Sequence, residues 1–336
     1  MKAAVLRGPE TIATETIDDP AVPDDGIVIR VRACGVCGSD LHVYKAGKDQ
    51  GTIFGHEFSG DVAEVGKNVM GITVGERVTA VGFRPCGTCF WCGKGSFHRC
   101  SDMALTGYQL PGAMAEYVTI PTAIPGQTVF TLPEGMTYEE GASVEPLSIS
   151  LFSVRRGKPK ETDTVAVLGL GVIGLNAISA LKSMGVSKIL ASGRRPPRLE
   201  AAKACGADLV IDAAQEDALA AIMEATGNMG VDCVVECAGS PQTFEQSIDM
   251  VKGRGSVLLV GIFEEPLIWN PEKVIAKNIS LVGCLGGNFP GAIDMIQSGK
   301  ADVGRFVTHR YSLDEAAEAF RVQHKDRSAV KVMIIP

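Results

Sequence analysis

The feature that most constrains the fold is a glycine pattern that follows directly on a short apolar segment. Residues 164–168 (TVAVL) lead into the spacing G-x-G-x-x-G. Glycines at this spacing allow a tight turn from a strand into a helix and a close approach of the backbone to a pyrophosphate. The N-terminus of the helix then faces the phosphates. The residues expected to bind a dinucleotide here are Gly169, Gly171, Val172, Ile173 and Gly174.

Around and beyond this turn, apolar strands alternate with helical stretches. Such alternation is typical of βαβ units, which place parallel strands in one sheet with helices on both faces. We therefore predict an α/β protein with a Rossmann-type, doubly wound parallel sheet over residues 148–288. The expected strands are Thr164–Leu168, Ile189–Ser192, Leu209–Ile211, Cys233–Glu236, Ser256–Val260 and Ile279–Val282.

The sequence before the glycine pattern has a different character. Over residues 1–147, short alternating runs such as Ile27–Ala33 and Arg77–Val81 are separated by glycine and proline. This arrangement predicts an antiparallel, barrel-like β-rich domain.

The last segment, residues 289–336, is expected to return to the first domain. It contains a short helix, then a second helix introduced by the capping pair Ser312 and Glu315, and finally the alternating run Val330–Ile335. The simplest partner for that last strand is the first domain. The parallel-sheet domain would then be an insertion between two parts of the other domain.

Length and charge exclude several classes of partner. A chain of 336 residues is long enough for two domains with separate cores. Its net charge of −7 disfavours an extended nucleic-acid or anionic-membrane surface. The longest apolar stretch, Val165–Leu181, is divided by glycines, and the first residues lack the apolar core of a signal peptide. We expect a cytoplasmic protein that acts on a small molecule and binds neither nucleic acid nor membrane.

Cysteine spacing predicts a structural metal site. Four of the ten cysteines follow the pattern C-x2-C-x2-C-x7-C, which supplies enough thiolates to close a tetrahedral zinc shell. Iron–sulfur proteins use a similar run, but the proline that normally follows their last cysteine is replaced here by Ser101. Four buried free cysteines are the plainer alternative. The cysteines concerned are Cys86, Cys89, Cys92 and Cys100.

A second set of candidate ligands is spread over the first domain. Cys37 lies in a glycine-rich turn, His56 and Glu57 follow one another, and Glu145 precedes a proline. A catalytic zinc typically takes three protein ligands and leaves one position for water or substrate. Taken singly, a buried cysteine usually packs in a core and a histidine usually makes an ordinary hydrogen bond. Cys34 could form half of a redox C-x-x-C pair with Cys37, but we favour a non-ligand role for it.

These motifs together resemble the zinc-dependent medium-chain alcohol dehydrogenases. The segment Gly55–Gly60 (GHEFSG), followed by Gly66 and Val69, is similar to the zinc signature of that family. The cysteine lobe, the GHE segment, Glu145 and the glycine pattern occur in the family's order over essentially the whole chain. Within the family the chain is most similar to the polyol, threonine and butanediol dehydrogenases. The resemblance implies a GroES-like catalytic domain and a dimeric or tetrameric homo-oligomer, of which we expect a tetramer.

The resemblance also implies roles at the second metal site. Cys37 and His56 are implied as zinc ligands, while Glu57 and Glu145 compete for the third position or exchange during turnover. The catalytic zinc and the four-cysteine zinc would make two ions per chain.

A proton relay is implied in the same way. The family places Ser39 next to the substrate oxygen and His42 near the cofactor ribose, and a histidine with a pKa near neutrality suits exchange with solvent. The plainer alternative for His42 is a hydrogen bond within its turn.

The end of the second strand of the parallel sheet points to the choice of cofactor. An NAD(H) enzyme carries an acidic residue there for the ribose diol, but this chain has Gly193. Arg194, Arg195 and Arg198 follow, and guanidinium groups suit a 2′-phosphate in charge and geometry. These residues predict NADP(H), with a solvated basic helix start as the alternative.

The predicted function is the interconversion of a secondary alcohol or polyol and its ketone. Zinc would act as a Lewis acid on the alcohol oxygen, and NADP+ would accept the hydride. Two other classes stay open: a zinc-independent NADPH reductase of the same architecture, and a non-enzymatic NADPH-binding sensor. Metal content and NADPH-dependent turnover discriminate among the three.

Overall fold

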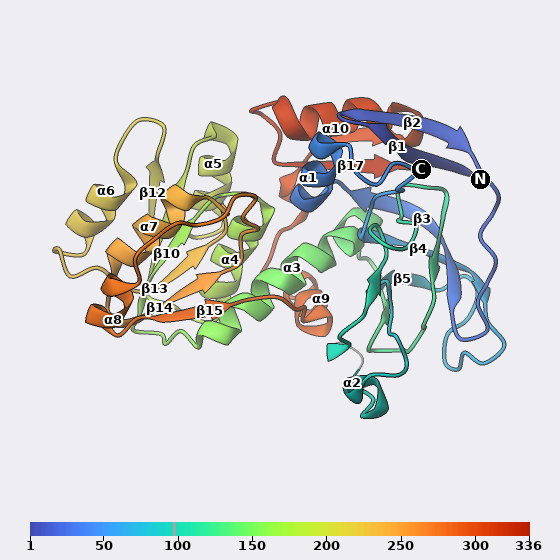
Figure 1. Ribbon diagram of the computed structural model, residues 1–336, viewed down its shortest axis with the longest axis horizontal. Coiled ribbons are helices and arrows are strands. Elements are labelled where there is room, and N and C mark those ends of the chain that lie inside the picture. The colour runs from blue at the N-terminus through green and yellow to red at the C-terminus, as the bar shows by residue number, and fades with distance from the viewer. Residues whose placement is uncertain (97–98) are drawn as a thin grey trace. The chain divides into compact units, whose positions relative to one another are not determined.

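The computed structural model describes residues 1–96 and 99–336 (Figure 1). The chain folds into two compact units. Unit 1 comprises Met1–Glu145 and Val307–Pro336, and unit 2 comprises Pro146–Phe306. The chain therefore leaves unit 1 once, builds unit 2 and returns.

The return to unit 1 comes later in the chain than the sequence suggested, at Val307 rather than at residue 289. The intervening helix α9 (Phe289–Gln297) packs within unit 2. The backbone N–H of Asn288 donates to the carbonyl oxygen of Ser148 at 3.1 Å, and the Cβ position of Gly291 lies 2.8 Å from a methyl group of Leu151. Both partners belong to α3, so tertiary packing keeps this segment with unit 2.

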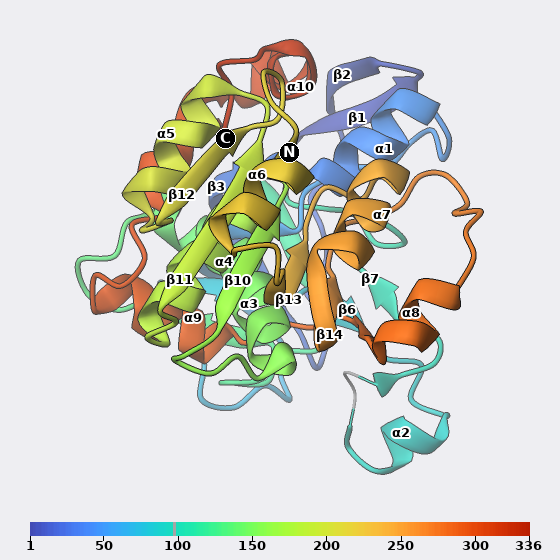
Figure 2. The ribbon, with the colours of Figure 1, turned by 90° about the vertical axis from the view of Figure 1, so that its left-hand side faces the viewer.

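Unit 2 is built on a six-stranded parallel sheet (Figure 2). Its strand order, β12-β11-β10-β13-β14-β15, reverses direction between β10 and β13, which is the arrangement that binds dinucleotides at the reversal point. Each strand predicted from the sequence is present. The strands are β10 (Thr164–Leu168), β11 (Lys188–Gly193), β12 (Leu209–Asp212), β13 (Val231–Glu236), β14 (Val251–Leu259) and β15 (Ser280–Gly283).

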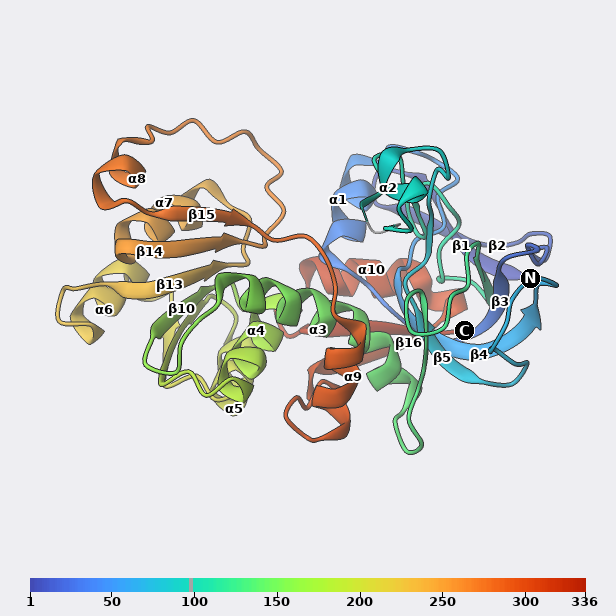
Figure 3. The same ribbon diagram turned by 90° about the horizontal axis from the view of Figure 1, so that it is seen from below.

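Helices cover both faces of this sheet (Figure 3). Helices α4 and α5 contact one another on one face, and α6, α7 and α8 form a contacting series on the other. Because both faces are covered, the central strands are apolar along their length, and Val165, Ala166 and Val167 are fully buried. The helices are α4 (Val172–Ser183), α5 (Pro196–Ala204), α6 (Ala218–Ala225), α7 (Pro241–Met250) and α8 (Glu272–Lys277).

The long apolar stretch Val165–Leu181 is accounted for by β10, the glycine turn and the start of α4. In the part of the chain that the structure describes, no helix has the length and apolar character needed to span a bilayer.

Unit 1 is dominated by a seven-stranded sheet with the order β16-β17-β3-β4-β5-β9, in which β8 also pairs with β3. Two small sheets, β1-β2 and β6-β7, complete the unit. Its strands are β1 (Lys2–Gly8), β2 (Thr11–Thr16), β3 (Ile27–Gly35), β4 (Glu57–Val65), β5 (Arg77–Ala80), β6 (Phe83–Arg84), β7 (Ala104–Leu105), β8 (Tyr117–Ile120), β9 (Val129–Thr131), β16 (Val307–Ser312) and β17 (Lys331–Ile335).

Unit 1 also contains short helices between its strands. Helix α1 (Gly38–Ala46) follows β3, and α2 (Phe90–Gly93) lies in the cysteine lobe. Helix α3 (Tyr138–Gly157) begins in unit 1 and ends in unit 2, with Pro146 at the division.

The end of the chain joins the sheet formed near its beginning, as the sequence predicted. Strand β17 pairs antiparallel with β3, and in Figure 1 the red C-terminal elements lie beside the blue N-terminal ones. The predicted capping box of Ser312 and Glu315 is present ahead of α10 (Ala316–Lys325). Phe320 of α10 is fully buried, with its ring 5.1 Å from that of Tyr44 and 5.3 Å from that of Phe54. The C-terminal segment therefore supplies part of the core of unit 1.

Candidate functional site

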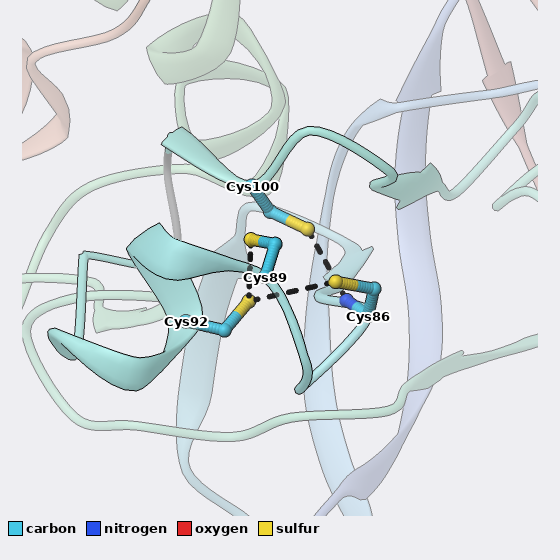
Figure 4. A group of neighbouring side chains, drawn as sticks. All are labelled: Cys86, Cys89, Cys92 and Cys100. Atoms are coloured by element: carbon cyan, nitrogen blue, oxygen red, sulfur yellow. Dashed lines mark hydrogen bonds between the residues drawn. The ribbon is translucent and has the colours of Figure 1, made fainter.

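Four cysteine sulfurs converge in the small lobe of unit 1 that contains α2 (Figure 4). The sulfurs of Cys86, Cys89, Cys92 and Cys100 all lie within 4.8 Å of one another. The Cys89–Cys92 distance is 3.5 Å and the Cys86–Cys92 distance is 3.9 Å. A Zn–S bond of about 2.3 Å places the sulfurs of a tetrahedral shell about 3.8 Å apart. The lobe therefore has the size that one tetrahedral ion needs.

The chemistry of these thiols also fits a metal. Hydrogen bonds from the backbone N–H groups of Ser101 and Cys92 lower the pKa of the Cys89 thiol to about 5, while burial raises the pKa of Cys92 to about 12. The thiolate is the form that binds metal, and all ten cysteines are free thiols. An iron–sulfur cluster places several irons and sulfides between its thiolates, so it needs a wider spacing than one shared ion.

A second group brings together Cys37, His56 and Glu57, whose ligand atoms lie within 4.8 Å of one another. Cys37 is the N-cap of α1, His56 lies in the loop before β4, and Glu57 is the first residue of β4. Gly55 makes this approach possible, because it has φ +104° and its Cβ position would lie 2.6 Å from the sulfur of Cys34. One sulfur, one nitrogen and one oxygen donor could hold a zinc ion here.

Cys34 lies outside this donor group in the part of the chain that the structure describes. It is fully buried, and burial raises the pKa of its thiol well above the usual value. A buried thiol of this kind is inert.

Asp40 is a site residue that the sequence analysis missed. It is fully buried in α1, and its Oδ2 accepts the backbone N–H of Cys37 at 2.9 Å. Its Oδ1 lies 3.5 Å from His56 Nδ1, and among the described residues neither of these two atoms has a hydrogen-bond partner. Burial alone would lower the pKa of His56, but Asp40 and then Cys37 raise it well above the usual value. Asp40 is placed to hold Nδ1 and leave Nε2 for a metal. The acidic residue three positions after the N-cap was the available sequence signal.

Lys331 is a second residue that the sequence analysis missed. Its ammonium group forms an ion pair with the carboxylate of Glu57 and donates to the carbonyl oxygen of Val36 at 3.0 Å. Both charged side chains are less than 5% exposed. Burial alone would lower the pKa of Lys331, but the charge of Glu57 outweighs it and raises that pKa. No local pattern marks this lysine, because it reaches Glu57 only through the pairing of β17 with β3.

Glu145 lies at the end of unit 1 and is half-buried. Desolvation raises the pKa of its carboxyl group to about 7, against the opposing charge of His56. The charges of His56 and Glu57 thus affect the pKa of Glu145. Glu145 itself does not belong to the group of candidate ligands formed by Cys37, His56 and Glu57. A nearby cation would stabilise its ionised form.

Ser39 and Tyr108 extend the polar surroundings of Cys37. The hydroxyl of Ser39 donates to the sulfur of Cys37 at 3.2 Å and accepts a hydrogen bond from the hydroxyl of Tyr108 at 2.7 Å. The ring of Tyr108 lies 5.3 Å from that of His56, and burial raises the pKa of Tyr108 to about 12, so it stays a donor. The sequence analysis missed Tyr108, which lies in a loop and carries no motif.

His42 follows Ser39 by three residues in α1, so the two side chains lie near the same face of the helix. It is half-buried. Burial, and then the charge of Lys45, lower the pKa of His42. The imidazole is therefore neutral near pH 7 and can accept a proton.

The glycine turn of unit 2 has the geometry of a dinucleotide cradle. Gly169 has φ +94°, and Gly174 is held so close that a Cβ there would lie 1.9 Å from the carbonyl oxygen of Gly169. A Cβ at Gly171 would meet no protein atom within 4 Å, which leaves space for a ligand. The backbone N–H groups of Val172 and Ile173 open α4, where a helix binds anions.

A second loop supports this turn. Glu236, at the end of β13, is fully buried and accepts backbone N–H groups of Ala238 at 2.9 Å and Gly239 at 3.0 Å. Ala238 in turn closes on the glycine turn, because a Cβ on Gly169 would lie 2.7 Å from its backbone nitrogen. Glu236 thus orders the loop at the point where the strand order reverses.

The predicted 2′-phosphate residues gather at the end of β11. Gly193 ends the strand and is buried, while Arg195 is the N-cap of α5. Arg194 is exposed and donates to the side chain of Gln242 at 2.8 Å. Burial, and then the charge of Arg195, lower the pKa of Arg198 to about 10. This is a strongly cationic region.

Comparison with known proteins agrees with both units. A model of the alcohol dehydrogenase GroES-like domain matches residues 23–134, and a model of the zinc-binding dehydrogenases matches residues 172–298. The sorbitol dehydrogenase of Bacillus subtilis (strain 168) is 34% identical, with 100% of this chain and 97% of the relative covered. The (R,R)-butanediol dehydrogenase of the same strain is 33% identical, with both chains fully covered. The chain is a member of the zinc-dependent medium-chain alcohol dehydrogenase family.

Solved structures agree with this membership. A zinc-binding dehydrogenase from Sinorhizobium meliloti 1021, bound to NADP, superposes with a TM-score of 0.90 at 30% identity, covering 100% of this chain and 99% of that one. The predicted combination of a GroES-like and a Rossmann domain is confirmed. As a member of this family, the dehydrogenase is an oxidoreductase that acts on the CH–OH group of an alcohol or polyol.

We predict that Asp40→Asn weakens zinc binding at the Cys37 group of this dehydrogenase by about 10- to 100-fold, because an amide no longer fixes the histidine tautomer as a carboxylate does. Titration of metal-free protein with zinc in the presence of a competing chelator measures the change. Asp314→Asn, at an exposed ion pair with Lys2, serves as the control. Equal zinc affinity of Asp40→Asn and the parent would contradict the role of Asp40.

The two glycines of the dehydrogenase's cofactor turn should respond differently to alanine. Gly174→Ala forces a methyl group onto a backbone carbonyl and should lower the free energy of unfolding by about 1 to 3 kcal/mol. Gly171→Ala should melt like the parent but bind dinucleotide more weakly, because its methyl group projects into space where no protein atom lies. Thermal melting and cofactor titration separate the two effects. A Gly171→Ala variant with parental cofactor affinity would show that the dinucleotide does not approach this glycine.

Proposed function

We propose that this dehydrogenase interconverts a secondary alcohol or polyol and its ketone, with a catalytic zinc ion and NADP(H). The convergence of Cys37, His56 and Glu57 carries the proposal, because three different donor types meet there with a buried carboxylate behind the histidine. Zinc at an open site supplies Lewis-acid activation of the alcohol oxygen, and NADP+ supplies the hydride acceptor.

The protein's own residues would divide the work at this site. Cys37, His56 and Glu57 would hold the metal, with Glu145 as the carboxylate that exchanges with Glu57. The ion pair with Lys331 holds the carboxylate of Glu57 in place. The raised pKa of Glu145 favours a role in which a nearby cation stabilises its ionised form.

The proton released on alcohol oxidation would pass through Ser39 and His42. Ser39 already exchanges hydrogen bonds with Cys37 and Tyr108, so its hydroxyl can both accept and donate beside the metal ligands. His42 is neutral near pH 7 because its pKa is lowered. A neutral imidazole one helical turn away is suited to accept this proton.

The preference for NADP(H) is supported by the end of β11. Gly193 offers no carboxylate to bind a ribose diol or to repel a phosphate, and the arginines at positions 194, 195 and 198 supply positive charge. One charge-assisted hydrogen bond contributes about 1.5 to 3 kcal/mol, so two of them would give discrimination of about a hundredfold or more.

A structural zinc in the lobe formed by Cys86, Cys89, Cys92 and Cys100 completes the proposed metal content of two ions per chain. We further propose a cytoplasmic homo-oligomer, most simply a tetramer. Sedimentation of a monomer at working concentration would count against the oligomer.

The zinc proposal is tested by graded chelation. The chelator should remove the ion of the open site first, and the rate of alcohol oxidation should fall as that ion is lost. The ion held by four thiolates should remain bound because its shell is closed. Elemental analysis and activity are followed together. Cys37→Ser should hold one zinc and lose turnover, and Cys34→Ser, a buried neighbour outside the donor group, is the control. One metal in the parent, or full activity of Cys37→Ser, would overturn the catalytic assignment.

The relay proposal predicts a pH profile with a stated direction. A lowered pKa keeps His42 neutral as pH falls. The acidic limb of the pH profile, where the rate of alcohol oxidation declines, should therefore lie below the ordinary histidine pKa of about 6.5. His42→Ala should slow turnover by about 100-fold, as loss of a proton acceptor does. Lys45→Ala should move the limb to higher pH without lowering the plateau, because the charge of Lys45 helps to depress this pKa.

The comparison is made where hydride transfer limits the rate, which a deuterated alcohol establishes. An acidic limb that stays in place in both variants would leave His42 with only a structural hydrogen bond.

A further inference from the structure

Glu236 is the last residue of β13, next to the point where the strand order reverses. Its side chain is fully buried, and a buried carboxyl group is costly unless its oxygens accept hydrogen bonds. Oε1 accepts three of them, from the backbone N–H of Ala238 at 2.9 Å, from that of Gly239 at 3.0 Å and from the hydroxyl of Thr243 at 2.8 Å. One oxygen atom therefore fixes residues 237–240, which we call the β13 loop, and the first turn of α7.

The β13 loop contacts the part of the sheet that precedes the reversal. A Cβ on Gly169, the first glycine of the cofactor turn, would lie 2.7 Å from the backbone nitrogen of Ala238. Directly after the loop, the side chain of Gln242 accepts a hydrogen bond from Arg194 at 2.8 Å. The loop and the start of α7 thus border the glycine turn and the cationic region that follows β11.

Glu236 also holds the carboxyl end of β14, the neighbour of β13 on the other side of the reversal. Its carbonyl oxygen accepts the backbone N–H groups of Val260 and Gly261, each at 2.9 Å. An idealised Cβ on Gly261 would lie 2.8 Å from Oε2 of Glu236. A Cβ on Gly239 would clash with the carbonyl oxygen of Ile262. The β13 loop and the end of β14 are therefore in backbone contact, and Glu236 is bonded to both.

The two halves of a dinucleotide would rest on these connected segments. A dinucleotide binds outside the carboxyl ends of the strands, across the point of reversal. The cationic region after β11 and the glycine turn after β10 suit the adenosine ribose and the pyrophosphate, so the ends of β13 and β14 are left for the nicotinamide half. The side chain of Glu236 fixes a loop that borders the first half, and its main chain fixes a strand end that borders the second.

We propose that Glu236 is a positioning residue that couples the two halves of the dinucleotide site, because it holds the β13 loop against the glycine turn and also holds the end of β14. The inference rests on the proposed use of a nicotinamide dinucleotide. It does not depend on the choice between NADP(H) and NAD(H), because the contacts of Glu236 lie at the reversal and not at the end of β11.

Replacing the carboxylate separates the hydrogen-bond acceptor from the space that it fills. Glu236→Leu removes the acceptor and leaves the N–H groups of Ala238 and Gly239 without it. We expect this variant to bind the complete dinucleotide at least about tenfold more weakly than the parent. Glu236→Gln is the matched control, because its amide oxygen can take the place of Oε1. Its affinity should stay within about threefold of the parent.

A fragment of the cofactor shows whether both halves are affected. 2′-Phospho-ADP-ribose contains the adenosine ribose and the pyrophosphate of NADP+ but lacks the nicotinamide. In Glu236→Leu we expect the affinity for this fragment to fall about threefold and that for NADP+ about tenfold or more, because only NADP+ uses both segments. The ratio of the two affinities should therefore fall. A fold that is merely less stable would lower both affinities by the same factor.

Thr243 provides a milder change in case Glu236→Leu does not fold. Thr243→Val removes one donor to Oε1 at nearly constant volume, and Thr243→Ser keeps the hydroxyl group. Thr243→Val should lower the affinity ratio by about twofold, the loss of one hydrogen bond to the loop. Thr243→Ser should keep the ratio of the parent.

Dissociation constants are measured by titration of the intact protein without substrate, well below the melting temperature of each variant. Parental affinity of folded Glu236→Leu for NADP+ would overturn the proposal. An unchanged affinity ratio in Glu236→Leu, or in Thr243→Val where the former does not fold, would also overturn it. A Glu236→Gln variant that binds as weakly as Glu236→Leu would show that the acceptor is not what matters, and it too would overturn the proposal.

Failure of the proposed cofactor preference looks different. NAD+ and ADP-ribose are titrated in parallel as a second pair. A parent that binds NAD+ more tightly than NADP+ would overturn the preference for NADP(H), and the affinity ratio of the second pair would then decide the role of Glu236. A parent that binds neither dinucleotide would overturn both proposals.

Discussion

The buried ion pair between Glu57 and Lys331 is the interaction on which the proposed open metal site depends. Both charged groups are buried, so removing one partner would leave the other as an uncompensated buried charge, which is strongly destabilising. Glu57 belongs to the first part of unit 1, whereas Lys331 lies in the last strand, beyond the whole of unit 2. The carboxylate beside His56 is therefore held only when the two distant parts of unit 1 have joined through β3 and β17.

The two proposed metal sites differ in how their surroundings shift the pKa values of the ligands. In the open site, burial raises the pKa values of Cys37 and Glu145, so both favour their neutral forms until a cation is present. In the lobe, backbone hydrogen bonds lower the pKa of Cys89, while burial raises that of Cys92. The lobe is thus suited to hold an ion as part of the fold, and the open site to use the charge of an ion in chemistry.

Close steric contacts fix the position of the glycine turn in unit 2. The glycine turn approaches the backbone of Ala238 on one side and the end of β11 on the other, and Glu236 orders the loop that closes on it. The same close packing brings Leu170 against Gly193.

The sequence by itself determined the features that are local along the chain. Strand and helix periods, cysteine spacing and the glycine pattern predicted the two domain types, and the capping residues Ser312 and Glu315 predicted the start of the C-terminal helical segment. Only the tertiary structure decided the pairing of Lys331 with Glu57, the contact of Tyr108 with Ser39 and the packing of Leu170 on position 193. It also decided that the chain returns to unit 1 at Val307. These features join segments that are far apart in the chain. Local periodicity and residue spacing do not predict which distant side chains come into contact in the folded protein.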